Sequence, residues 1–296
     1  MTIGPVTVGP VTVGPGCDPA RLRSDIVSEQ VSRRAVVAGL LLLAPASAPV
    51  PESPLLPPEA RDLWRDGVVL ARAGRSLVVG HHTPPGTLDE LARRADTAGR
   101  RVSDVLGRPV RPLVVVPGSA REAAGLAGVG RVDGLAAVAD GGRVIVVPEV
   151  FARLNSTGKD VVLAHELTHV VAGTGDLPVW LYEGFADYVG YRDAGLPVRT
   201  AAAELADEVR AGRVPSELPG PAAFAADGRD PVRLARAYQE AWLACRFLAD
   251  RFSEETLVGF YRDAQASGVD RALSSLGLSV ATLTARWRVY VREQLT

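Results

Sequence analysis

The chain has 296 residues, of which 47% are hydrophobic and 23% are charged, and its formal net charge is −1. This hydrophobic content is ample for a buried core, and the length allows one large domain or two small ones. The near-neutral charge supplies no basic surface for phosphates, so we expect no nucleic-acid partner.

The first 48 residues predict a low-complexity tail and an export signal. Residues 4–8 and 9–13 both read Gly-Pro-Val-Thr-Val, a repeat that cannot form a core. Arg33-Arg34, an apolar stretch at 35–44 and Ala46-Ser47-Ala48 follow in the order of a cleavable signal peptide. The arginine pair also resembles a twin-arginine signal. We therefore expect export to the cell envelope or exterior, with membrane contact only if the signal is uncleaved. A buried N-terminal helix is the alternative.

Residues 49–59 are rich in proline and predict an extended linker, so the folded domain is expected at 60–296. From 60 to 157, short runs of β-branched residues alternate with helical spacing, which predicts a sheet with helices. Turns rich in glycine join four of the runs into two hairpins. The expected strands are 68–70, 77–79, 113–116, 135–139 and 144–147, and the expected helices are 87–106, capped by Thr87, and 119–126.

From residue 158 to 296 the spacing of apolar residues is almost entirely helical. The expected helices are 160–172, 179–191, 199–212, 232–252, 254–265, 269–276 and 279–294, with a loop rich in proline and glycine at 213–231. The sequence therefore predicts an α+β fold, in which an N-terminal mixed sheet with helices precedes a mainly helical C-terminal subdomain. We expect the functional site in the cleft between these two parts.

His165, Glu166 and His169 belong to the sequence His-Glu-Leu-Thr-His in an apolar helix. Histidines four residues apart lie on one face of a helix about one turn apart. That separation is within the reach of a single Zn²⁺ ion. The glutamate between them can lie beside the ion without binding it and take a proton from water. The pattern predicts a catalytic site with one Zn²⁺ ion as cofactor.

A catalytic zinc ion needs a third protein ligand and an open position. Glu183 is the best candidate, because the thirteen residues between it and His169 suffice for one helix to end and a second to pack back against it. Asp187 follows one turn later on the same face. From there it could accept the free N–H of a liganding histidine and fix its orientation.

The motif His-Glu-x-x-His at 165–169, followed by Glu-Gly-x-Ala-Asp at 183–187, resembles the gluzincin metallopeptidases. This superfamily includes thermolysin and the zinc aminopeptidases, and the form Trp-Leu-x-Glu-Gly-x-Ala at 180–186 is most similar to bacterial MA-like peptidase domains. The resemblance implies a zinc peptidase that acts on a peptide or protein substrate. It also implies the roles of five residues: zinc ligands His165, His169 and Glu183, general base Glu166, and Asp187 as a hydrogen-bond partner of a ligand.

The resemblance also implies an oxyanion donor and a substrate-binding strand. Related enzymes use a tyrosine or histidine on a later helix, and no histidine follows His169, so Tyr238 is the candidate. A core tyrosine on an amphipathic helix would look the same. The hairpin at 135–147 is the candidate sheet edge for substrate. Its segment 134–138 lacks the acid with which zinc aminopeptidases bind the α-amine, so we expect an endopeptidase.

Two other functions stay open, a non-catalytic zinc-binding module and an aminopeptidase, and the presence of Glu166 speaks against the first. His81 and His82 could form an extra metal site, but adjacent histidines before a proline-rich turn are more typical of a solvated loop. The two cysteines, Cys17 and Cys245, support no disulfide framework. We expect Cys245 to act as a small buried apolar residue.

Overall fold

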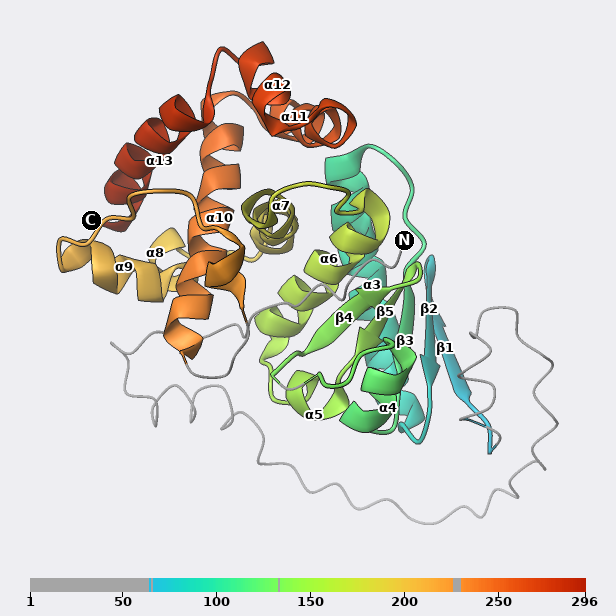
Figure 1. The fold of residues 1–296 in the computed structure, drawn as a ribbon. Coiled ribbons are helices and arrows are strands. Elements are labelled where there is room, and N and C mark those ends of the chain that lie inside the picture. The colour runs from blue at the N-terminus through green and yellow to red at the C-terminus, as the bar shows by residue number, and fades with distance from the viewer. Residues whose placement is uncertain (1–63, 65, 133, 226–229) are drawn as a thin grey trace.

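The computed structural model of the protein describes residue 64 and residues 66–132, 134–225 and 230–296. The predicted tail, export signal and linker lie outside these residues. Within them the chain forms a mixed sheet with helices, followed by a mostly helical C-terminal part (Figure 1). This arrangement confirms the α+β prediction. None of the described helices is long and apolar enough to cross a membrane.

The sheet has five strands in the order β1-β2-β3-β5-β4. β1 (Val69–Ala73) and β2 (Ser76–Gly80) form one antiparallel hairpin, and β4 (Ala137–Asp140) and β5 (Arg143–Val146) form the other. β3 (Leu113–Val116) lies between the hairpins, parallel to β2 and β5. Both predicted hairpins are confirmed, and β4 is an outer strand of the described sheet.

Helices cover the sheet and make up most of the rest of the described chain. In chain order they are α3 (Pro85–Leu106), α4 (Ala120–Leu126), α5 (Pro148–Phe151), α6 (Ser156–Ala172), α7 (Val179–Tyr191), α8 (Val198–Ala201), α9 (Ala203–Arg210), the 3-10 helix η1 (Pro221–Phe224), α10 (Pro231–Arg251), α11 (Glu254–Ser267), α12 (Val269–Ser275) and α13 (Val280–Leu295). In Figure 1, α7 is seen end-on between α6 and α10. α7 packs against both of these helices.

Three helix boundaries differ from the prediction for local reasons. α3 begins at Pro85 rather than being capped by Thr87, because proline fits the first turn of a helix, where its missing N–H costs nothing. α6 begins earlier than expected, since the side chain of Asn155 caps its first turn. The helix expected at 199–212 is divided at Ala202, whose φ of −116° and ψ of 46° leave the helical region.

Alternate residues of the strands point to opposite faces of the sheet, as the pleat requires. Val114 and Val144 belong to the core that includes α3 and α6. Val115 and Ile145 belong to a second, smaller cluster with residues of α4. Because both faces are covered, the central strands are apolar throughout.

The larger core continues from the sheet into the helical part, where it includes Phe185, Trp242 and Trp287. The two parts therefore share one hydrophobic core. Cys245 is buried in it, with its thiol 3.8 Å from the carbonyl oxygen of Leu181, as expected of a small core residue.

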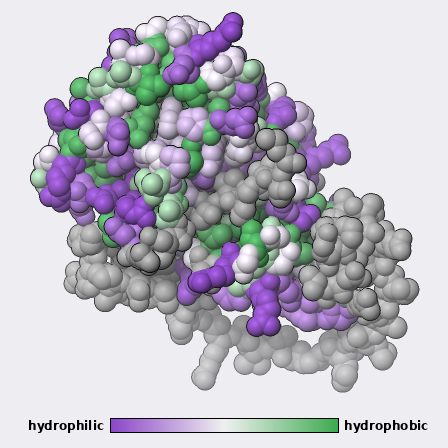
Figure 2. Space-filling view, in the orientation of Figure 1, coloured by the Kyte–Doolittle hydropathy of each residue, from purple (hydrophilic) through white to green (hydrophobic). Residues whose placement is uncertain are grey.

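The outer surface is of mixed polarity. Figure 2 shows hydrophilic groups interspersed with small hydrophobic areas over the described helices. The prediction of a solvated loop at the histidine pair is wrong for His81, which is only 4% exposed. It is right for His82, which is exposed. Burial of His81 follows from packing against residues distant in sequence, which the local pattern does not reveal.

Candidate metal centre

His165, Glu166 and His169 are buried in the C-terminal half of α6. Their exposed fractions are 0%, 0% and 6%. The helix is enclosed because β4, β5 and α3 pack against it together with α7. Titratable side chains at such positions are costly unless they are paired or bind a metal ion. These buried side chains therefore need partners that offset the free-energy cost of removing them from water.

Glu183 and Asp187 reach the histidines from α7, which packs closely between its two neighbours. A Cβ atom at Gly184 would lie 2.2 Å from the carbonyl oxygen of Ala241 in α10. Where α7 contacts α6, a Cβ atom at Gly190 would lie 3.1 Å from the carbonyl oxygen of Val161. The two glycines thus allow the backbones to approach, which brings the acidic residues of α7 against α6.

Three ligand atoms converge at this contact. Nε2 of His165 lies 2.9 Å from Nε2 of His169, and Oε2 of Glu183 lies 3.2 Å from the first nitrogen and 3.5 Å from the second. Ligand atoms of a tetrahedral zinc site, with zinc–nitrogen bonds of about 2.0–2.1 Å, are separated by roughly 3.3 Å. The observed separations are close to that value. The side chains therefore fit a zinc ion, and this group is the three-ligand set expected from the sequence.

Asp187 orients the first histidine. Its Oδ1 lies 2.7 Å from Nδ1 of His165. A carboxylate only accepts hydrogen bonds, so Nδ1 carries the proton and Nε2 is turned toward the other two ligands. A carboxylate behind a liganding histidine in this way fixes the ring and makes the imidazole a stronger ligand. Asp187 thus has the contact predicted for it.

The charges of the group call for a cation. Burial lowers the pKa of His165, but the neighbouring Asp187 and Glu183 outweigh it and raise that pKa to about 10. Burial likewise raises the pKa of Glu183, but contacts with both histidines hold it below its ordinary value. For His169, burial prevails and lowers the pKa. Two buried carboxylates therefore surround a position that favours positive charge, which a proton or a metal ion can supply.

Glu166 has a different environment from the other acids. Both oxygens of its carboxylate are buried and have no hydrogen-bond partner. Burial raises the pKa of this carboxyl to about 8, against the opposing charge of His165. Unpaired buried oxygens are costly and rare. Their presence beside the ligand group fits a carboxylate whose partner is a water molecule held at the metal.

Two tyrosines are relevant to oxyanion binding. Tyr182, half-buried in α7, has its ring centroid 6.0 Å from that of His169, in an edge-on arrangement. Tyr238, the residue expected from the sequence, is buried in α10, and its ring lies against Phe224 at 5.2 Å between centroids. The role of Tyr238 stays a prediction. Tyr182 had no signal in the sequence beyond its place next to Glu183.

The outer strand β4 packs against α6, the helix that carries the histidines. The backbone of Ala139 in β4 approaches the carboxyl of Glu166 and slightly opposes the rise of its pKa, although no hydrogen bond of ordinary geometry joins the two. The hairpin proposed as a substrate-binding edge is therefore adjacent to the general-base candidate.

No family model and no curated protein matches this chain. The interpretation of the site therefore depends on its own geometry and chemistry.

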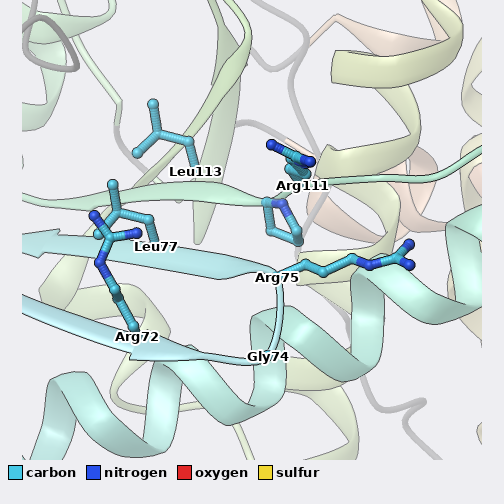
Figure 3. Close-up of a pocket in the computed structure, with 7 residues that line it drawn as sticks. Arg72, Gly74, Arg75, Leu77, Arg111 and Leu113 are labelled. Atoms are coloured by element: carbon cyan, nitrogen blue, oxygen red, sulfur yellow. The ribbon is translucent and has the colours of Figure 1, made fainter.

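A surface pocket of about 480 Å³ lies at the turn between β1 and β2 and contains none of the residues of the metal group. Arg72, Arg75 and Arg111 contribute to its wall. In Figure 3 their guanidinium groups point in different directions. Anion binding normally uses donors that converge on one point, so this pocket is not a second candidate site.

Proposed function

We propose that this chain is a zinc-dependent peptidase, most similar in its site to the gluzincins, with His165, His169 and Glu183 as ligands of one zinc ion. The observation that supports it best is the convergence of three ligand atoms beside a buried carboxylate that has no partner. A purely structural zinc site is normally closed by a fourth protein ligand, and it has no use for an unpaired acid beside it.

Zinc at this position would act as a Lewis acid that lowers the pKa of water and polarises the scissile carbonyl. Glu166 takes one proton from the attacking water as its oxygen bonds to the carbonyl carbon. It then delivers that proton to the nitrogen of the leaving amine as the C–N bond breaks. Burial raises the pKa of Glu166 above its ordinary value, so this carboxylate is a stronger base than an exposed glutamate and can still release the proton to the leaving amine.

A hydroxyl donor would stabilise the negative charge on the carbonyl oxygen in the transition state. Tyr238 is the candidate from the resemblance, whereas the ring contact with His169 favours Tyr182. Tyr182 is half-buried, whereas the ligands beside it are buried, so substrate is proposed to approach from the side of Tyr182.

The substrate is proposed to be a peptide or protein in extended conformation, aligned on β4. An outer strand offers unpaired backbone groups to such a ligand. Peptides that carry N-methyl groups at alternate positions should then lose most of their kcat/KM, while unmodified peptides of equal sequence are cleaved. Equal cleavage of both peptides would exclude alignment along the strand.

The decisive experiment compares Glu166→Gln with the wild type. We expect the variant to keep one zinc ion at this group and to lose at least 10²-fold in peptide hydrolysis, since it lacks the base. Glu217→Gln, the same change at an exposed glutamate, is the control and should leave activity unchanged. Unchanged hydrolysis in Glu166→Gln would refute the mechanism. Zinc binding without hydrolysis in the wild type would favour a non-catalytic binding module.

An internally cleaved peptide with an acetylated N-terminus would establish endopeptidase activity, since an aminopeptidase requires the free amine. The proposal extends to export, on the basis of the arginine pair, apolar stretch and small residues at 33–48. N-terminal sequencing of the protein from the culture medium or cell envelope would test the export signal and its cleavage.

A further inference from the structure

A second group of ligand-type side chains lies where the first hairpin meets the start of the described chain. It consists of Asp66 with His81 and His82, the two residues that follow β2, and we refer to it as the histidine-pair cluster. One ligand atom from each of the three lies within 4.8 Å of the others. Nε2 of His81 is 2.9 Å from Oδ1 of Asp66, and Nε2 of His82 is 2.6 Å from Oδ2.

Glu122 determines which nitrogen of His81 carries a proton. Its Oε2 accepts the indole N–H of Trp64 at 2.9 Å and the backbone N–H of Gly118 at 3.0 Å. The same oxygen lies 2.9 Å from Nδ1 of His81. Because a carboxylate cannot donate, Nδ1 must donate to it. The carboxylate, held by two fixed donors, thus directs Nε2 of His81 toward Asp66.

The contact between His81 and Asp66 therefore needs a positive charge. In the neutral ring the lone pair of Nε2 would face an oxygen lone pair at 2.9 Å, which is repulsive. Either a proton or a metal ion must lie between them. The side chain of His81 is only 5% exposed, so water cannot replace that cation by solvating the ring.

The backbone of His82 brings a second imidazole to the same carboxylate. Among the described residues other than glycine, it alone has a positive φ, 52°. Such a conformation costs free energy and persists where the surroundings require it. The two rings stack at 3.8 Å between centroids, and Trp64 stacks on the other side of His81 at 5.1 Å. Both rings present Nε2 to the same carboxylate, an arrangement in which one divalent cation can bind both rings and the carboxylate.

We propose that Asp66, His81 and His82 bind a divalent transition-metal ion such as Zn²⁺, with Glu122 positioning His81. Two imidazoles and one carboxylate are a ligand set typical of zinc, with water completing the coordination. The side chains of Asp66 and His82 are 55% and 66% exposed, so the ion can enter and Asp66 can adjust by a few tenths of an ångström. The ion joins Asp66 to the two residues that follow β2, and through the contact of His81 with Glu122 it is connected to α4.

The test is a titration of the chelator-treated full-length chain with Zn²⁺, followed by calorimetry and by metal analysis after gel filtration. We expect two equivalents in the wild type. The double variant Asp66→Asn/His82→Gln should lose one equivalent and keep the other. Glu122→Gln should weaken the second equivalent about 10- to 100-fold, which is typical of a residue that orients a ligand. Asp104→Asn, at an exposed aspartate of α3, is the control and should bind two equivalents.

The two zinc proposals fail separately. If Glu183→Gln removes one equivalent and the double variant keeps both, the histidine-pair cluster is an ion-pair network without metal and this inference is wrong. If instead the wild type binds a single equivalent that only Asp66→Asn/His82→Gln removes, the histidine-pair cluster binds metal. The centre at His165 and His169 would then be refuted.

Discussion

Gly184→Ala is expected to disturb the metal centre without touching any of its ligands. A Cβ atom at residue 184 would lie 2.2 Å from the carbonyl oxygen of Ala241, 2.6 Å from its carbonyl carbon and 3.1 Å from Sγ of Cys245. An ordinary contact needs about 3.4 Å or more, so α7 and α10 must separate by roughly 1 Å. Since the obstacle is backbone, no side-chain rotation can relieve it.

Two effects of opposite sign determine how much Gly184→Ala changes the free energy of unfolding. Alanine is better than glycine in a helix by about 1 kcal/mol. Overpacking a well-packed core costs about 1–3 kcal/mol, occasionally more. We expect the upper part of that range, because Gly190 limits the movement of α7 toward α6. The free energy of unfolding should therefore fall by about 1–2 kcal/mol. Glu183 moves with the helix, and since zinc–ligand distances tolerate only about 0.2 Å, zinc affinity should fall at least about tenfold.

The assay is urea unfolding of the metal-free protein, together with competition for Zn²⁺ against a chromophoric chelator. The matched control is Gly259→Ala in α11, where a Cβ atom would meet nothing within 4 Å. The control should be more stable by up to about 1 kcal/mol, with zinc affinity unchanged. If Gly184→Ala behaves like Gly259→Ala in both measurements, the close packing of α7 on α10 is not what positions Glu183.

Four further predictions concern the site and its surroundings. Asp187→Asn should weaken zinc binding about 10- to 100-fold in the same competition assay. Tyr182→Phe should lower kcat about 10²-fold with little change in KM, and a larger loss in Tyr238→Phe would assign the donor to α10 instead. Removal of zinc by a chelator should lower the Tm, since an ion at 100 times its Kd contributes about 2.7 kcal/mol; an unchanged Tm would contradict binding to the folded state. Burial raises the pKa of Glu240 from 4.5 to about 7, against the charge of Arg236, so the contribution of Glu240 to stability is full below pH 4.5 and is lost as the pH rises through 7. The free energy of unfolding of Glu240→Gln, measured in urea, should therefore exceed that of the wild type by about 2–3 kcal/mol at pH 8 and nearly equal it at pH 4.

Local signals explain which elements the sequence predicted well. The hairpins could be predicted from the sequence because turns with glycine separate short apolar strands. Gly141 and Gly142, which form one such turn, both have positive φ. α6 and α7 could be predicted from the helical spacing of their apolar residues and from the glycines between them. The starts of α3 and α6 differ from the prediction because Pro85 begins α3 through its fixed backbone geometry and the Asn155 side chain caps α6, and neither effect depends on the hydrophobic pattern.

Contacts between distant segments explain what was missed. Burial of His81 depends on Trp64 and Asp66 from one segment and on Glu122 from another, and no motif links these residues to His81. Tyr182 was missed because its approach to His169 depends on how α7 packs on α6. Neither could be inferred from spacing, since both depend on the angle and distance between elements.

By itself, the sequence determined the α+β order of elements and the histidine pair on one face of α6, because helical periodicity is a local property. It also indicated Glu183 and Asp187, because one short turn leaves a following helix few ways to pack. Only the tertiary structure decided that the ligand atoms converge within 3.5 Å and that Glu166 lacks a partner. Those facts depend on backbone approach at Gly184 and on enclosure by other elements, which are properties of packing rather than of any one segment.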